Sequence, residues 1–175
     1  SLTLRQVKNA SGEFPLILLA RGELCRYPRL GFVIATGVRH VFRRAQCFDR
    51  WFGRAPSRGR EAFCRQLGLD AARPLILYVC TALIKGSPAE PEFVQEWLTW
   101  LRGSGDPAVA TASVLIRPHP SQAGRWREFD PQAHDRVVVW GGNPVDDASR
   151  ADYFDSLYHS DAVVGLNTSA FIEAG

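Results

Sequence analysis

The chain has 175 residues, of which 46% are hydrophobic and 22% are charged, and its formal net charge is +3. This composition is ordinary for one globular domain with a core of its own. Arginines cluster at 39–44 and 50–65. No recognised nucleic-acid-binding motif accompanies them, so we interpret them as solvated helix faces and expect no nucleic-acid partner. No apolar run approaches the roughly 20 residues of a membrane-spanning helix.

The four cysteines are Cys25, Cys47, Cys64 and Cys80. None belongs to a Cys-x-x-Cys pair, and their spacing is not that of a zinc site. The sequence also shows no metal cluster and no Rossmann glycine fingerprint, so we expect no metal and no cofactor. We take the cytoplasm as the default location. The chain contains no methionine, and its last residues lie inside an expected helix. We therefore expect a fragment that is truncated at its C-terminus.

Residues 1–44 show no clear hydrophobic period, and we leave this N-terminal segment unassigned. Within this segment, residues 15–20 are compatible with a strand or with a short buried helix. The composition of residues 31–41 favours β-structure.

From residue 45 the pattern predicts alternating helices and strands. The strands are continuously apolar, as expected of parallel strands covered on both faces, and the longest helix has an apolar stripe at helical spacing. The expected elements are a helix from an N-cap at Ser57 to Leu67, a strand over 75–80, a helix over 90–101, a strand over 113–116, a weak helix over 124–129, a strand over 137–140, a helix capped by Ser149 or Asp152 and ending at His159, a strand over 162–166, and a helix beginning at Ala170. This alternation predicts an α/β fold, namely a Rossmann-like, doubly wound parallel sheet.

Polar residues directly follow two of the expected strands. Arg117-Pro118-His119-Pro120 follows the strand over 113–116, and Asn167-Thr168-Ser169 follows the strand over 162–166. Open α/β sheets build ligand sites at the carboxyl ends of their strands. We therefore expect His119 and Ser169 to face one crevice from adjacent parallel strands.

His119 is the first candidate ligand-binding residue. Its flanking prolines hold the backbone extended and fix its direction, and Arg117 beside it favours contact with an anionic oxygen. A histidine also suits a general base, but nothing nearby resembles a nucleophile, so we favour binding over catalysis. The alternative is a loop histidine packed against a neighbour. In either case we expect it to support no helix.

Asn167, Thr168 and Ser169 lie where the last strand meets a helix N-terminus. Amides and hydroxyls there bind phosphate oxygens, reinforced by the helix dipole, although the same residue types also serve as simple N-caps. Glu173 lies one turn further along, where a carboxylate can accept hydrogen bonds from ribose hydroxyls. Its alternative role is to balance the helix dipole from an exposed position.

Weaker candidates follow the other two strands. Thr81 and Lys85 follow the strand over 75–80, but their segment matches no phosphate-loop pattern. Gly141 and Gly142 follow the strand over 137–140, where exposed backbone suits a nucleobase edge and a plain turn is the alternative. His159 is expected to be packed rather than catalytic.

Taken together, residues 117–120 and 153–174 resemble the C-terminal domain of GT-B-type glycosyltransferases. The likeness extends over about 46–175. It is closest to uncharacterised bacterial GT-B-like proteins. More distantly, the chain is similar to the His-Pro and Ser/Thr motif transferases, which include bacterial sialyltransferases and CDP-glycerol glycerophosphotransferases.

The resemblance implies that residues 45–175 are the donor-binding half of a GT-B fold. His119, Thr168 and Ser169 would bind the donor phosphates, and Glu173 would bind the ribose. The implied reaction transfers a sugar, or a sugar-alcohol phosphate, from a nucleotide-activated donor without a bound metal.

The general base would lie on a missing N-terminal half, so we expect the fragment itself to be inactive. Peripheral membrane association of the full-length protein stays open. The alternatives are a sugar-nucleotide 2-epimerase of the same fold and a non-catalytic nucleotide-binding or interaction module.

Overall fold

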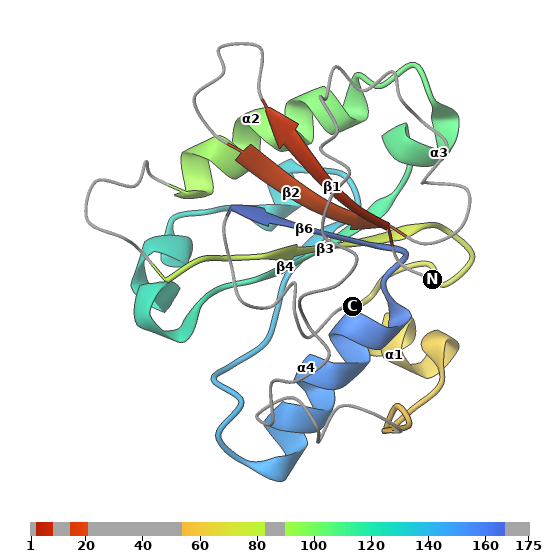
Figure 1. Ribbon diagram of the computed structural model, residues 1–175, viewed down its shortest axis with the longest axis vertical. Helices are drawn as coiled ribbons and strands as arrows, with labels where there is room; N and C mark the ends of the chain where they lie inside the picture. Colours follow the sequence, from red (N-terminus) through yellow and green to blue (C-terminus); the bar gives the residue numbers. More distant parts are fainter. Residues whose placement is uncertain (1–2, 9–14, 21–53, 83–89, 167–175) are drawn as a thin grey trace.

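The computed structural model describes residues 3–8, 15–20, 54–82 and 90–166, which form an α/β fold (Figure 1). The strands are β1 (Thr3–Lys8), β2 (Pro15–Ala20), β3 (Leu75–Val79), β4 (Ser113–Arg117), β5 (Val137–Val139) and β6 (Ala162–Leu166). The α-helices are α1 (Arg60–Gln66), α2 (Glu90–Arg102), α3 (Pro107–Ala110) and α4 (Asp147–His159), and the 3-10 helices are η3 (Pro120–Arg127) and η4 (Pro131–Ala133).

The six strands form one sheet in the order β1-β2-β6-β3-β4-β5. The last four strands in this order are parallel, and Leu77 of β3 lies opposite both Leu115 of β4 and Val163 of β6. β1 and β2 are antiparallel to each other, and β2 is antiparallel to β6. The expected parallel sheet is confirmed, and two antiparallel strands extend it at one edge.

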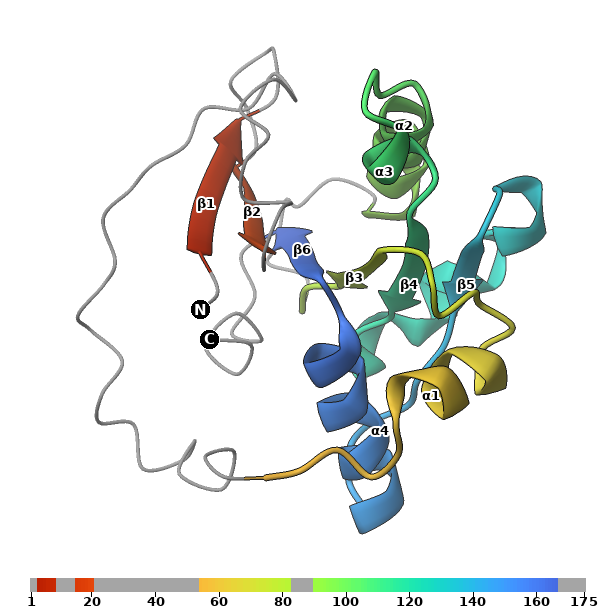
Figure 2. The same ribbon diagram turned by 90° about the vertical axis from the view of Figure 1, so that its right-hand side faces the viewer.

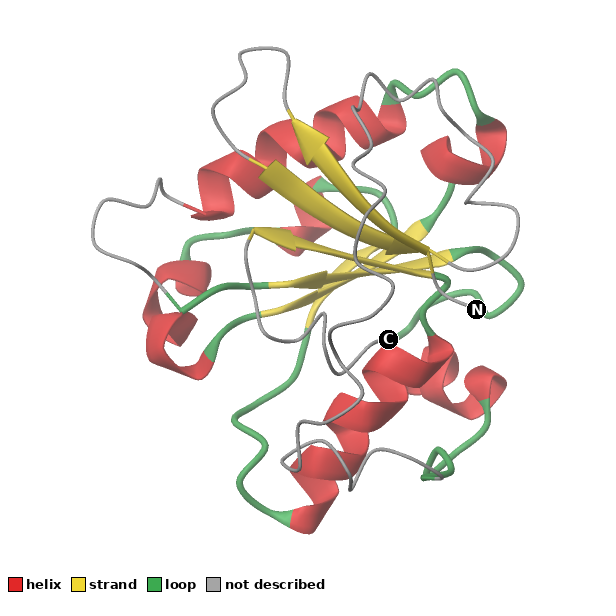
Figure 3. Ribbon diagram, in the orientation of Figure 1, coloured by secondary structure: helices red, strands yellow, loops and turns green. Residues whose placement is uncertain are grey.

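Helices cover both faces of the sheet, as a doubly wound fold requires. Figure 2 shows α2 and α3 on one side and α1 and α4 on the other, and Figure 3 shows the same layers by element type. On the first face Trp97 packs against Tyr78, with ring centroids 5.5 Å apart. On the second face Phe63 meets the edge of Trp140 at 6.0 Å. Every residue of β3 and β4 is buried, because their apolar side chains are covered from both sides.

The expected N-cap at Ser57 is wrong. The residue before α1 is Gly59, without a side-chain cap. Ser57 instead donates from its backbone N–H and its hydroxyl to the Asp155 carboxylate, at 2.8 and 2.5 Å. A serine satisfies a buried carboxylate with the same groups that it uses in a cap, so the sequence alone does not separate the two roles. The expected end of this helix near Leu67 is confirmed: Leu67 is its C-cap, and Gly68 follows with a φ of 69°.

The start of α4 also differs from expectation. Its N-cap is Asp146, which accepts from the Ser149 backbone N–H at 2.7 Å, and the Ser149 hydroxyl accepts from the Asp146 N–H at 3.2 Å. Ser149 is thus the third helical residue of a capping box rather than the cap. His159 at the end of this helix is buried, as expected, and its Nε2 lies 2.8 Å from the Arg58 carbonyl oxygen.

Four short elements differ from the expected pattern. Three of them were not expected, namely β1, α3 and η4. The helix α3 begins at a proline and is capped by Asp106, whose carboxylate accepts from the Ala108 N–H at 2.8 Å. The weak helix expected over 124–129 is the 3-10 helix η3, which begins earlier, at Pro120.

Candidate functional site

The chain order of the parallel strands creates a switch point between β3 and β6. From β3 the chain moves outward through β4 to β5 and then returns, through α4 on the opposite face, to β6 on the other side of β3. In open α/β sheets ligands bind beyond the carboxyl ends of the strands where the winding direction reverses. Here those ends are the residues after Val79 and after Leu166.

The strands before His119 and Ser169 are not adjacent, which corrects our expectation. β3 lies between β4 and β6 and pairs with both in parallel. The carboxyl ends of all three strands nevertheless lie on one edge of the sheet. A shared crevice therefore requires a ligand that reaches across the end of β3.

His119 has the extended backbone expected from its flanking prolines, with φ of −69° and ψ of 137°. Its Nδ1 accepts from the Ser121 backbone N–H at 3.2 Å and lies 2.8 Å from the Ser121 hydroxyl. His119 is therefore the N-cap of η3, and the expectation that it supports no helix is wrong.

This cap also assigns the tautomer of the neutral imidazole. Because Nδ1 accepts a backbone N–H, the ring proton of the neutral form lies on Nε2. Nε2 has no hydrogen-bond partner among the residues that the structure describes. His119 thus holds one N–H donor available to a ligand, in an orientation fixed by the other ring nitrogen.

Arg117 is 5% exposed, and its hydrogen bonds are made to the protein. Nη1 donates to the Ser156 hydroxyl at 2.9 Å and to the Asp152 carbonyl at 3.3 Å, and Nη2 donates to the Gly142 carbonyl at 3.4 Å. The guanidinium also lies 5.4 Å from the Trp140 ring centroid and 5.2 Å from that of Tyr153.

No carboxylate forms an ion pair with Arg117 in the described part of the chain. Burial lowers the pKa of its guanidinium. The arrangement fits a residue that holds β4, the turn after β5 and α4 together. It places the charge beside the candidate site rather than in direct contact with a ligand.

The turn after β5 is built around Arg117. Gly141 has a φ of 112°, and a Cβ placed on it would lie 2.5 Å from the Arg117 Cζ. Gly142 has open space around its α-carbon, and its carbonyl accepts from Arg117. The plain-turn alternative therefore accounts for these two glycines without a nucleobase.

A buried carboxyl group that the sequence analysis missed lies at the end of β3. Glu90, the first residue of α2, is 4% exposed and accepts from the Thr81 backbone N–H with both oxygens, at 3.1 and 3.2 Å. The Tyr78 hydroxyl donates to Oε1 at 3.2 Å. Burial raises the pKa of Glu90, an effect that the hydrogen bonds from Thr81 and Tyr78 oppose.

Thr81 is therefore occupied in holding Glu90. Its side chain is hydrogen-bonded to the same carboxyl group, and the residue is 9% exposed. An acidic residue in the first turn of a helix is common on solvated helices. For that reason the burial of Glu90 could not be predicted from the sequence. The five remaining candidates lie outside the described residues: Lys85, Asn167, Thr168, Ser169 and Glu173.

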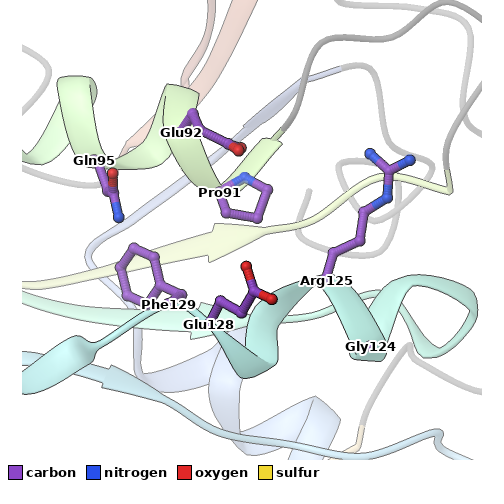
Figure 4. A pocket seen from close by; sticks show the side chains of 7 residues that line it. All are labelled: Pro91, Glu92, Gln95, Gly124, Arg125, Glu128 and Phe129. Atoms are coloured by element: carbon purple, nitrogen blue, oxygen red, sulfur yellow. The ribbon is translucent and has the colours of Figure 1, made fainter.

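A separate open groove of about 540 Å³ lies between the N-terminal half of α2 and the C-terminal end of η3 (Figure 4). Its charged lining consists of the carboxylates of Glu92 and Glu128 and the guanidinium of Arg125. None of the predicted site residues lines it. Its excess of carboxylates does not favour a phosphate group.

The described residues lack two other kinds of feature. None of the helices there has the length and apolarity to cross a membrane. No group of three or more acidic, histidine or cysteine side chains in those ranges is placed to hold a metal ion. Comparison with known protein families, with curated proteins and with solved structures gave no match to this chain.

Proposed function

We propose that the chain is the donor-binding domain of a GT-B-type glycosyltransferase. In this proposal it binds the nucleotide of an activated donor and takes part in the transfer of a sugar or a sugar-alcohol phosphate. The proposal rests on the resemblance of residues 117–120 and 153–174 to that family, together with the strand order around β3 and β6.

The strongest support for the proposal is the fixed orientation of the His119 imidazole. Its Nδ1 is held by Ser121, and among the residues that the structure describes its Nε2 has no hydrogen-bond partner. The ring lies just beyond the carboxyl end of β4. A hydrogen bond from a fixed donor to a phosphate oxygen stabilises both the bound nucleotide and the charge that grows on it as it departs. Asn167, Thr168, Ser169 and Glu173 would complete the contacts to phosphates and ribose.

Arg117 supports this site in the proposal by fixing the end of β4, two residues before His119. Its distance from solvent makes it a positioning residue. The proposed location is the cytoplasm, where nucleotide-activated donors would be bound. We propose no role for the groove between α2 and η3 in binding the nucleotide.

The test is thermal stabilisation by a panel of nucleoside mono- and diphosphates and their sugar esters. We expect at least one nucleotide to raise the melting temperature of the wild-type protein. His119→Asn keeps a side-chain acceptor for the Ser121 N–H but removes the Nε2 donor. It should weaken binding roughly tenfold to a hundredfold, the value of one hydrogen bond to a charged group.

His134→Ala is the matched control, because it removes an imidazole that stacks on Phe129 away from the candidate site. It should bind the nucleotide like the wild type. Equal binding by the wild type and His119→Asn would contradict the assignment of His119. Absence of any nucleotide effect would favour the interaction module.

A further inference from the structure

The groove between α2 and η3 is lined by polar side chains that are not paired with one another. Glu92 and Gln95 line it from α2, and Arg125 and Glu128 line it from the end of η3 (Figure 4). All four residues are exposed. In the part of the chain that the structure describes, none of the three charged groups forms an ion pair and none of the four side chains forms a hydrogen bond. Their donors and acceptors are therefore available to a ligand.

The repeats of the two helices bring these side chains to the walls of the groove. Residues three apart eclipse one another in a 3-10 helix, so Arg125 and Glu128 share one face at the end of η3. Residues three and four apart are neighbours on an α-helix, so Gln95 lies beside both Glu92 and Pro91 on α2. Two regular elements thus hold the polar groups of the groove.

The rest of the lining is apolar and firmly held. Phe129 is buried and Pro91 is half-buried. The Phe129 ring stacks on His134 with centroids 5.5 Å apart, and the Trp126 ring meets it at 5.2 Å in an edge-on arrangement. A fixed apolar surface between polar walls suits a ligand that presents C–H groups as well as polar groups.

Both walls of the groove begin at the carboxyl edge of the sheet. The carboxyl group of Glu90, the first residue of α2, accepts from the Thr81 backbone N–H beyond the end of β3. The helix η3 begins directly after His119, beyond the end of β4. Open α/β sheets bind their ligands at this edge. The position of the groove therefore points to a ligand independently of its lining.

The charges of the lining favour a neutral ligand. An anion would be repelled by the carboxylates of Glu92 and Glu128, and a cation would be repelled by the guanidinium of Arg125. A carboxylate only accepts hydrogen bonds, a guanidinium only donates them, and the Gln95 amide does both. A hydroxyl group also does both, so a ligand with several hydroxyl groups can satisfy the whole set at once.

We propose that this groove binds a neutral, hydroxyl-rich ligand of the saccharide or polyol class. The hydroxyl groups of the ligand donate to Glu92 and Glu128 and accept from Arg125 and Gln95, and its C–H groups contact the apolar lining. This inference goes beyond the proposed function, because it concerns a second site and requires no nucleotide.

Residue-resolved NMR of the wild-type chain tests the proposal. The probes are glycerol, ribitol, glucose and N-acetylglucosamine, each titrated to millimolar concentrations, with spermidine and sulfate as charged probes. We expect at least one of the four hydroxyl-rich probes to shift the backbone amide resonances of Gln95, Gly124 and Arg125 in a saturable manner. Neither spermidine nor sulfate should do so.

Two variants test the contacts. Glu128→Gln and Arg125→Gln should each weaken binding of the active probe about tenfold or more, the value of one hydrogen bond to a charged group. Glu96→Gln and Arg127→Gln are the matched controls, because they remove the same charges from exposed positions of α2 and η3 that do not line the groove. Both controls should bind the probe like the wild type.

Three results would overturn the proposal. The first is the failure of all four hydroxyl-rich probes to shift these resonances. The second is a saturable shift caused by spermidine or sulfate alone, and the third is unchanged affinity for the active probe in both Glu128→Gln and Arg125→Gln. The melting experiments with nucleotides decide the proposed function separately, because none of these outcomes depends on a bound nucleotide.

Discussion

The guanidinium of Arg117 occupies the space in which a side chain on Gly141 would begin. A Cβ on Gly141 would lie 2.5 Å from Cζ, and the glycine has a φ of 112°. The buried arginine and the glycine therefore depend on each other at the ends of β4 and β5. This pair fixes the backbone from which His119 extends.

Gly141→Ala should destabilise the protein by about 2–4 kcal/mol, because it combines backbone strain with displacement of a buried guanidinium. Gly142→Ala is the control, since its α-carbon has open space and it should change stability by less than about 0.5 kcal/mol. Urea unfolding of the two variants measures the difference. Equal stabilities would show that Arg117 moves aside freely.

Arg117→Lys should lower the free energy of unfolding by about 1–3 kcal/mol, although it keeps the charge. A single ammonium cannot reach Gly142, Asp152 and Ser156 together, as the guanidinium does. Chemical denaturation is again the measurement, with Arg127→Lys at an exposed position as the control. A fully stable Arg117→Lys would indicate that charge alone matters at this position.

His119→Ala should cost about 0.5–1 kcal/mol of stability through loss of the cap on η3. His119→Asn should cost less, because asparagine is itself a good N-cap. Differential scanning calorimetry without ligand compares the two variants. If both lost the same stability, the Ser121 hydrogen bond would not be the stabilising contact.

Glu90 should make stability depend on pH. Because burial raises the pKa of the folded carboxyl above its ordinary value of 4.5, the folded protein binds this proton more tightly than the unfolded chain does. The resulting stabilisation is complete below pH 4.5 and is lost as the pH rises through the raised value. Unfolding free energies of the wild type should therefore fall, relative to those of Glu90→Gln, as the pH is raised from 4.5.

Glu92→Gln provides the comparison for this pH dependence, because it removes a carboxyl group from the same helical turn at an exposed position. A constant difference between the wild type and Glu90→Gln would mean that Glu90 is as accessible to water in solution as Glu92.

The fold was predictable where local pattern and tertiary environment agree. The continuous apolar runs of β3, β4 and β6 occur because helices cover both faces of the sheet. The apolar stripe on α2 occurs because one face of this helix packs against the sheet. β1 was missed because it is an edge strand whose sequence, Thr3–Lys8, contains no continuous apolar run.

The site was predictable only in outline. The flanking prolines predicted the extended backbone of His119. Its role as the N-cap of η3, through the Ser121 N–H, depends on a turn that no sequence pattern indicates. The residue type of Arg117 suggested a ligand contact, whereas its partners come from α4 and the turn after β5. The burial of Glu90 depends on contacts with β3, which helix periodicity cannot reveal.

The most direct test of the central claim is a crystal structure of the protein with a nucleotide that stabilises it. We predict a phosphate oxygen within about 2.7–3.2 Å of the His119 Nε2, with the phosphates beyond the carboxyl ends of β3 and β6. A nucleotide bound in the groove between α2 and η3, or anywhere that leaves Nε2 without a phosphate contact, would contradict the account.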